Sequence, residues 1–238
     1  MATASAQSTR TVLECGFKII PGKEDKFAVF NDALYPVAIS QDGFESVYGG
    51  DIHNSTWRYV GVRYASAEQM NAWHHHPRHK AAQKAAYDRW WTAVYMRKWR
   101  EAAPGESLTG KVMNETRLAM PAPLHDTQLH ALQKNLSTLE DLGASPFETL
   151  TGEYEAQPYQ LIGPNEAAPE IGGVFYLLIT HWPSPAAADA WKGSSAYKAL
   201  QELGALTSDT FMALPEAFSR DHLREDKLQR EWQLEAHG

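Results

Sequence analysis

Hydrophobic and polar positions near the start of the chain change their period in a regular order. Residues Thr11 to Ile20 are rich in apolar and β-branched side chains and predict a strand, which a Pro-Gly pair ends. An amphipathic helix of about a dozen residues is expected from Lys23. A second strand is predicted between Gly43 and Asp51 and a third from Thr56 to Tyr64, joined as a hairpin.

From Ser66 onward the apolar positions recur every three or four residues, which is the period of a helix. Ser66 and the acidic and amide residues behind it fit a helix N-cap, and Pro77 is expected to interrupt the helix. A further helix is predicted from Lys80 to Arg100, because its aromatic side chains would share one helical face. A strand within Leu108 to Met120 is then expected to close this half.

The second half of the chain repeats this order of elements. The expected elements are a helix at 128–142, strand material at 147–162, a strand at 174–180, a helix at 185–203, and a short strand near Phe211. A charged tail, 219–238, is predicted to be helical and solvated.

The repeat is also visible residue by residue. The segment Tyr64 to Trp73 aligns without gaps on Trp182 to Trp191, and both have an aromatic residue, a Ser two positions later, and an Ala-Trp ending. We therefore predict an α+β fold with two ferredoxin-like domains, at 11–120 and 125–216, that together form an α+β barrel. Whether the barrel closes within one chain or in a homodimer is left open.

Composition and charge narrow the classes of function. The chain has eight Trp and ten Tyr, enough to line an aromatic pocket, and its net charge of -7 argues against a nucleic-acid partner. No segment approaches the roughly 18 consecutive apolar residues of a membrane helix, and the N-terminus lacks signal-peptide features, so we expect a cytoplasmic protein. A single cysteine, Cys15, excludes an internal disulfide and a cysteine-cluster metal site.

The most unusual segment is the histidine cluster that follows Trp73. His75 and His79 are four residues apart, the spacing of a metal pair on a helix, although Pro77 between them disturbs that geometry. Three interpretations stay open: a hydrogen-bonded cluster at a helix bend, a metal or haem site, and acid/base catalysis. His79 is the preferred catalytic candidate, because it projects toward the same face as Trp73.

The remaining candidates are aromatic and cationic. Trp73, Trp57, Trp91 and Tyr95 are candidate substrate-binding side chains, although a packed core is the plainer interpretation of the aromatic stripe. The candidates for stabilising a substrate anion beside His79 and His75 are Arg58, Arg63 and Tyr87.

An aromatic strand end, a Ser-x-Glu, a helix Trp and a His six residues later resemble the antibiotic-biosynthesis-monooxygenase family of the dimeric α+β barrel superfamily. In this sequence these are Tyr64, Ser66, Glu68, Trp73 and His79. The resemblance covers about residues 11 to 118 well and 125 to 215 more weakly. It implies a dimeric α+β barrel fold, and the family contains cofactor-independent oxygenases, haem-degrading enzymes, isomerases, cyclases and members without known activity.

For function, the resemblance implies an oxygenase that takes O2 and a small aromatic or polyketide-type substrate, needs no cofactor or metal, and uses His79 to deprotonate the substrate. A haem protein with His79 or His75 as axial ligand is the alternative, although Gln83 stands where haem-degrading members have their ligand. A non-catalytic ligand-binding or stress-response barrel is the third. In the second half Tyr197 replaces His79, which suggests a scaffold that has lost the histidine cluster.

Overall fold

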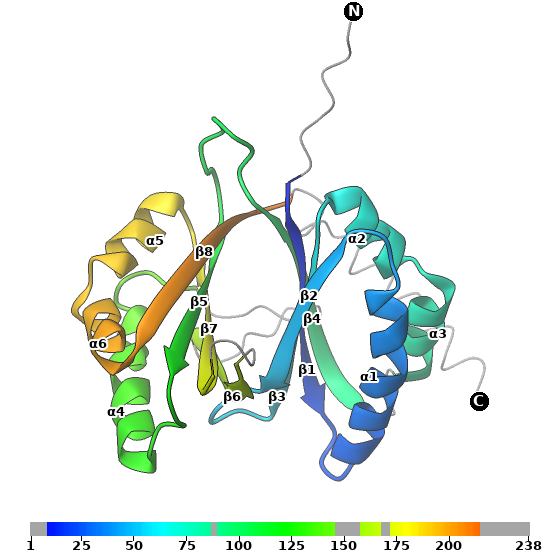
Figure 1. Ribbon diagram of the computed structural model, residues 1–238, viewed down its shortest axis with the longest axis horizontal. Helices are drawn as coiled ribbons and strands as arrows, with labels where there is room; N and C mark the ends of the chain where they lie inside the picture. Colours follow the sequence, from blue (N-terminus) through cyan, green and yellow to red (C-terminus); the bar gives the residue numbers. More distant parts are fainter. Residues whose placement is uncertain (1–8, 87–89, 146–157, 168–171, 215–238) are drawn as a thin grey trace, which may run out of the picture. The chain divides into compact units, whose positions relative to one another are not determined.

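The computed structural model describes residues 9–86, 90–145, 158–167 and 172–214, and they fall into two compact units (Figure 1). Each is a mixed α/β unit with helices packed on an antiparallel sheet. The first unit takes in residues 9–48, 60–86, 90–107 and 214. The second takes in residues 49–59, 108–145, 158–167 and 172–213. The tip of the first hairpin thus belongs to the second unit, and Leu214 belongs to the first.

Four strands form the sheet of the first unit, in the order β2-β3-β1-β4. Its elements in chain order are β1 (Thr11–Ile19), α1 (Glu24–Ile39), β2 (Phe44–Asp51), β3 (Trp57–Tyr64), α2 (Ala67–His74), α3 (Pro77–Ala86) and β4 (Trp91–Arg100). One sheet face packs with the helices around a buried cluster that includes Leu13, Val62, Tyr64, Met70 and Trp73. This core holds α2 against the sheet.

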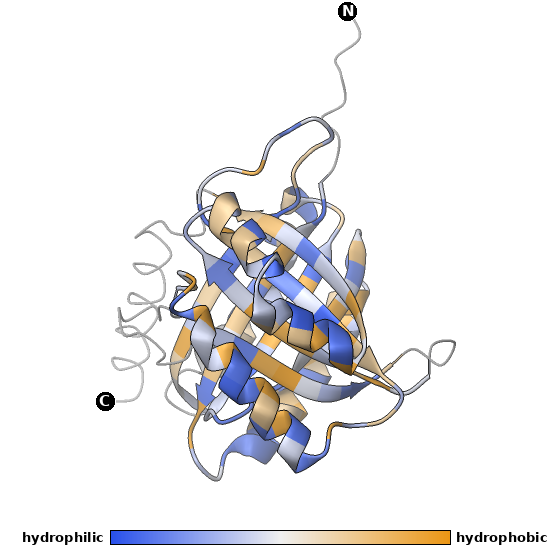
Figure 2. Cartoon of the chain, turned by 90° about the vertical axis from the view of Figure 1, so that its left-hand side faces the viewer, coloured by the Kyte–Doolittle hydropathy of each residue, from blue (hydrophilic) through white to orange (hydrophobic). Residues whose placement is uncertain are grey.

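The second unit has the same order of elements, and its strands lie in the equivalent order β8-β5-β7-β6. Its elements are β5 (Val112–Met120), α4 (Asp126–Leu136), the 3-10 turn η1 (Ser137–Leu139), β6 (Tyr159–Glu166), β7 (Val174–Trp182), α5 (Pro185–Lys192), α6 (Ser195–Leu203) and β8 (Ala205–Ala213). Its helices carry both hydrophilic and hydrophobic residues, as Figure 2 shows from their side, so one face of each can turn toward the sheet.

The predicted helix from Lys80 to Arg100 is wrong. The structure ends α3 at Ala86 and forms β4 from Trp91 onward. Trp91, Tyr95 and Trp99 are four residues apart, and a spacing of four returns to the same face in a strand as well as in a helix. Because β4 is buried on both faces, it also lacks the polar alternation that marks a half-exposed strand.

This change moves the strand that was expected to close the first half. The segment within Leu108 to Met120 is β5, and it opens the second unit. The predicted helix at 185–203 is two helices, because α5 ends at Lys192 with Gly193 as its C-cap, and Ser194 caps α6. The other described strands agree with prediction within a few residues, whereas 146–157 and the tail at 215–238 lie outside the described residues.

The aligned segments of the two halves have the same local geometry. The Ser66 Oγ accepts a hydrogen bond from the Gln69 amide, and the Ser184 Oγ accepts one from the Ala187 amide. Ser66 has φ -153° and ψ 160°, and Ser184 has φ -157° and ψ 160°. Both serines are therefore N-caps of the helix that carries the buried Trp.

No helix in the described part of the chain is long and apolar enough to cross a membrane.

Candidate functional site around Trp73 and His79

A break between two short helices positions the histidine cluster. Helix α2 ends at His74, and Pro77 is the first residue of α3. In a continuous helix the Trp73 carbonyl would accept the amide of residue 77, but proline has no N–H. The Trp73 carbonyl instead accepts the His76 amide at 3.0 Å and lies 3.3 Å from the Nδ1 of His79. Pro77 thus leaves an acceptor available to the His79 ring.

The rings of Trp73 and His79 are stacked. Their centroids are 4.4 Å apart and their planes differ by 8°. Trp73 is 4% exposed and belongs to the core cluster of the first unit, so one face of the imidazole rests on a rigid surface. The structure therefore brings together the two residues on which the sequence-based hypothesis depended most.

Burial sets the charge of His79. Its pKa is lowered to about 4, chiefly by desolvation and to a smaller extent by the charges of Lys80 and His76, while hydrogen bonds to the Trp73 and His74 carbonyls oppose the shift. The side chain is therefore neutral at pH 7. When Nδ1–H is the donor to the Trp73 carbonyl, the proton-free nitrogen is Nε2, which can act as a base or as a ligand.

Beside this pair lies a buried polar group that sequence reasoning did not find. Lys98 of β4 is 3% exposed, and its Nζ donates to the Asn71 Oδ1 at 2.8 Å. Burial, followed by the charge of Lys98, lowers the pKa of His74 to about 2. The sequence contains no clear signal of it, because Lys98 stands between Arg97 and Trp99 in a segment that was predicted to be a helix.

Of the other predicted catalytic residues, the structure describes His75 and Arg58. His75 is exposed at the end of α2. Arg58 belongs to the second unit, where it is ion-paired with Asp51. Trp57, its neighbour, is 3% exposed in that same unit. Tyr87 lies outside the described residues.

Trp91 and Tyr95 lie on β4 as core residues. The Trp91 ring packs against Phe17 at 4.9 Å and against Phe27 at 6.3 Å. Tyr95 is 1% exposed, and the Arg97 guanidinium lies 5.9 Å from its ring centroid. These contacts agree with the plainer interpretation, in which the aromatic residues fill the interior.

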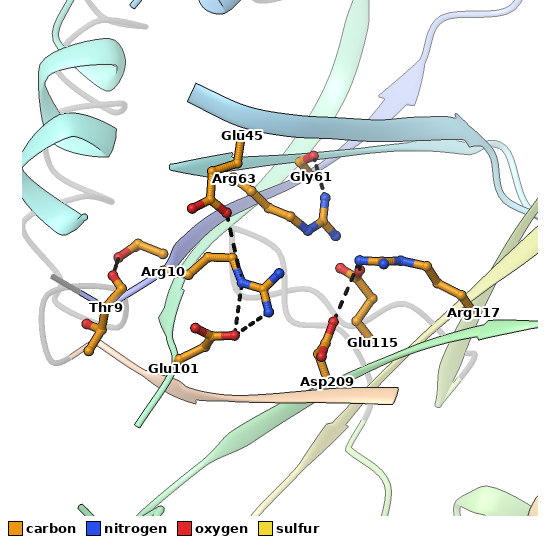
Figure 3. Close-up of polar contacts among 10 residues, drawn as sticks. Thr9, Arg10, Glu45, Gly61, Arg63, Glu101, Glu115, Arg117 and Asp209 are labelled. Carbon is orange, nitrogen blue, oxygen red and sulfur yellow. Dashed lines mark hydrogen bonds and ion pairs between the residues drawn. The ribbon is translucent and has the colours of Figure 1, made fainter. Parts of the chain in front are cut away.

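Polar residues also gather on the strands of the first unit away from His79. Arg63 is 1% exposed, donates through Nη1 to the Gly61 carbonyl at 3.2 Å and lies 4.3 Å above the Tyr48 ring. Figure 3 shows Arg63 beside Gly61, and Arg10 extending between Glu45 and Glu101. Arg63 thus has partners within its own unit.

Figure 3 also shows an acidic and basic group on the strands of the second unit. There Arg117 is ion-paired with the buried Glu115 at 2.6 Å and lies 3.7 Å from Asp209. Arg117 and Arg63 are therefore not free charges at the surface. Arg117 is held by the carboxylates of Glu115 and Asp209.

The equivalent position in the second unit keeps the Trp and changes its neighbour. Trp191 is fully buried, lies 6.2 Å from Trp182 in a stacked arrangement, and meets Tyr197 edge-on at 5.1 Å and 89°. Tyr197 thus takes the place of His79 with its ring turned. Within the described ranges, neither unit has a group of three or more His, Cys, Asp or Glu placed to hold a metal ion.

Comparison with known proteins finds similarity among solved structures. No family model matches the chain. No curated protein matches it either. An anthrone oxidase-like protein matches with 15% identity over 88% of this chain and 92% of its own, at a TM-score of 0.36. A protein of Fusobacterium nucleatum, provisionally named a monooxygenase, matches with 10% identity over 87% and 93%, at 0.38.

A shorter protein of unknown function from Nitrosomonas europaea matches with 19% identity, covering 41% of this chain and 94% of its own, at a TM-score of 0.36. Similarity at this level assigns neither a family nor an activity to the chain.

Proposed function

We propose that the first unit is the catalytic half of an oxygenase-type enzyme and that His79 removes a proton from a small aromatic substrate. The observation that carries this proposal is the neutral, oriented imidazole of His79. Its Nδ1 faces the Trp73 carbonyl, which leaves Nε2 as the proton acceptor. The depressed pKa keeps this acceptor unprotonated throughout the neutral range.

The proposed reaction needs no electron source besides the substrate. His79 takes a proton from an activated methylene group, the carbanion adds O2, and protonation gives a hydroperoxide. Loss of water from the hydroperoxide leaves a carbonyl group, so one oxygen atom enters the product and the other leaves as water. A weak base suffices only when the substrate is acidic, and delocalisation over fused aromatic rings supplies that acidity.

The sequence supports the same proposal independently. The residues that resemble the antibiotic-biosynthesis-monooxygenase family, Tyr64, Ser66, Trp73 and His79, occupy a strand end, an N-cap, a core anchor and a ring stacked on that anchor. We propose in addition that both units have the ferredoxin-like fold, which the element order and the strand orders support.

Oxygen uptake with a panel of anthrones and polycyclic phenols tests the proposal. His79→Ala is expected to slow uptake by a factor of roughly 10² or more, as for loss of a general base. Tyr197→Ala, the matched change in the second unit, is expected to leave most of the activity. Equal loss from both variants, or a bound ligand that stays unchanged in air across the whole panel, would exclude the proposal.

A haem protein is the second candidate, and the state of His79 favours it as well. A neutral imidazole that donates Nδ1–H to a carbonyl is the usual state of a metal-binding histidine, so His79 would be the residue to hold the haem iron, whereas His75 is exposed. Haem bound there would supply one-electron and oxygen chemistry. A Soret band that forms with added haem and disappears in His79→Ala would support it, and a flat visible spectrum would remove it.

A further inference from the structure

The second unit has a polar side chain, Asn114, at a sheet position where the first unit has the apolar Leu13. Asn114 and Leu13 are each the third residue of the strand that opens their unit. Leu13 contributes to the apolar cluster under α2, whereas Asn114 lies opposite Thr210 on β8 and Thr180 on β7. Residues directly opposite in antiparallel strands share a sheet face, so these three polar side chains are neighbours.

A chain of hydrogen bonds fixes the orientation of the Asn114 amide. The Lys192 Nζ, on α5, donates to the Thr210 Oγ1 at 3.0 Å, and Thr210 Oγ1 donates to the Asn114 Oδ1 at 2.8 Å. Because an ammonium can only donate, Thr210 is the acceptor in the first bond, which leaves its own proton for Asn114. The amide oxygen is therefore the atom that faces Thr210, and Nδ2 points elsewhere.

The Asn114 Nδ2 is a buried donor without an acceptor among the described residues. Asn114 is 0% exposed, and so is Trp191, whose Nε1 also lacks an acceptor there. A buried N–H donor costs free energy unless an acceptor forms a hydrogen bond with it. The first unit has Leu13 at the position equivalent to Asn114, so the fold does not require a polar side chain there. The positive charge of Lys192 has no carboxylate within ion-pair distance in the described part of the chain.

We propose that the second unit binds a small organic anion on the helix-facing side of its sheet, with Asn114 Nδ2 and Lys192 as its polar contacts. The ligand chemistry is an anionic oxygen, of a carboxylate or a phenolate, because both contacts are donors and one is charged. This assigns a binding role to the half of the chain that lacks the histidine cluster. It does not depend on the oxygenase proposed for the first unit.

Nuclear magnetic resonance of the full 15N-labelled chain tests the site. Benzoate and 4-nitrophenolate serve as the two probes, and neutral benzamide serves as the matched control for charge. The Asn114 side-chain signals are identified by their absence in Asn114→Leu and the Trp191 indole signal by its absence in Trp191→Phe. Saturable shifts of the Asn114 signals with at least one anion, and at least tenfold weaker binding of benzamide, are expected.

Asn114→Leu places the residue of the first unit in the second unit, so it is expected to fold and to bind the anion at least tenfold more weakly. Thr210→Val gives a second variant, which frees the amide from its hydroxyl partner and is expected to weaken binding severalfold. His79→Ala is expected to bind the anion unchanged, which separates this site from the proposed oxygenase. Absence of saturable shifts with both anions, equal binding of benzamide, or unchanged affinity in Asn114→Leu would overturn the proposal.

Discussion

The helix-facing layers of the two sheets have the same framework and different linings. Both are anchored by a buried Trp on a helix that a Ser caps, at Trp73 and at Trp191. Leu13, Cys15 and Val62 belong to the cluster of the first Trp, with Lys98 opposite Leu13, and the equivalent strand positions of the second sheet are Asn114, Thr116 and Thr180. The residues that hold the helices in place are thus kept, while those that would meet a ligand differ.

The aromatic rings that neighbour the two tryptophans also differ between the units. His79 lies flat on Trp73, whereas Tyr197 meets Trp191 with its edge. The imidazole of His79 has its Nδ1 beside the Trp73 carbonyl, which leaves Nε2 for other partners. This difference is consistent with the two proposals, proton transfer in the first unit and hydrogen-bond donation to an anion in the second.

The largest expected effect tests whether the buried Trp stabilises both units to the same extent. Trp73→Ala and Trp191→Ala should each lower the free energy of unfolding by about 3–5 kcal/mol, because each removes a buried aromatic side chain and leaves a cavity. Urea denaturation measures both. Trp90→Ala, at a partly exposed ring, is the control and should cost less. A loss below about 1 kcal/mol in either core variant would contradict the shared role of the two anchors.

A smaller effect is expected where a glycine of one unit faces a ring. Gly16 lies opposite Tyr95 in the sheet, and a β-carbon at Gly16 would overlap the Tyr95 ring. Gly16→Ala should therefore cost about 1–3 kcal/mol. The matching position in β5 is Arg117, where the second unit accommodates a long side chain. In a Tyr95→Ala background the cost of Gly16→Ala should vanish, and its persistence there would show that the ring is not the cause.

Stability should depend on pH less steeply when His79 is replaced by tyrosine, the residue at the equivalent position 197 of the second unit. An unfolded histidine binds a proton near pH 6.5 and the folded His79 only near pH 4, so the unfolded state holds more protons between these values. Stability is thus lost as pH falls from 6.5 toward 4, by about 1 kcal/mol per pH unit. His79→Tyr should reduce this slope, measured by urea unfolding at several pH values. The pKa of His74 is lowered chiefly by burial and by Lys98, with a smaller contribution from His79, so most of its effect is common to both proteins. An unchanged slope would contradict the lowered pKa of His79.

The smallest expected effect concerns the two serine caps. Ser66→Ala and Ser184→Ala should each cost about 1 kcal/mol, because each leaves the amide at the third helical position without its acceptor. Thermal unfolding is sensitive enough to compare the pair. Ser137→Ala removes an exposed hydroxyl at the end of α4 and should change the transition little. A cost confined to one of the two caps would show that the shared geometry is not equally important in both units.

Local signals in the sequence predicted the local parts of this structure. The Ser66 cap, the break at Pro77 and the buried Trp73 depend on residues within one or two turns of each other, so their pattern is visible in the chain. The stacked His79 followed from its position six residues after the Trp. The same signals at Ser184 and Trp191 exposed the repeat.

Features that depend on strand register could not be predicted in this way. Trp91, Tyr95 and Trp99 satisfy the period of a helix and of a strand at once, and only their pairing with β1 decides between the two. The contact of Lys98 with Asn71 followed from that same pairing. Asn114, Thr210 and Lys192 come from three separate elements, and no spacing along the chain indicates that they meet.

The last described residue has a consequence for synthesis. The Leu214 amide donates to the Lys98 carbonyl at 3.0 Å, so the first unit obtains this backbone bond from a residue that follows the whole second unit. On the ribosome, β4 emerges before β5 to β8, and its Lys98 carbonyl stays without this donor until Leu214 has been translated. A nascent chain halted after residue 107 would carry β4 without this backbone partner.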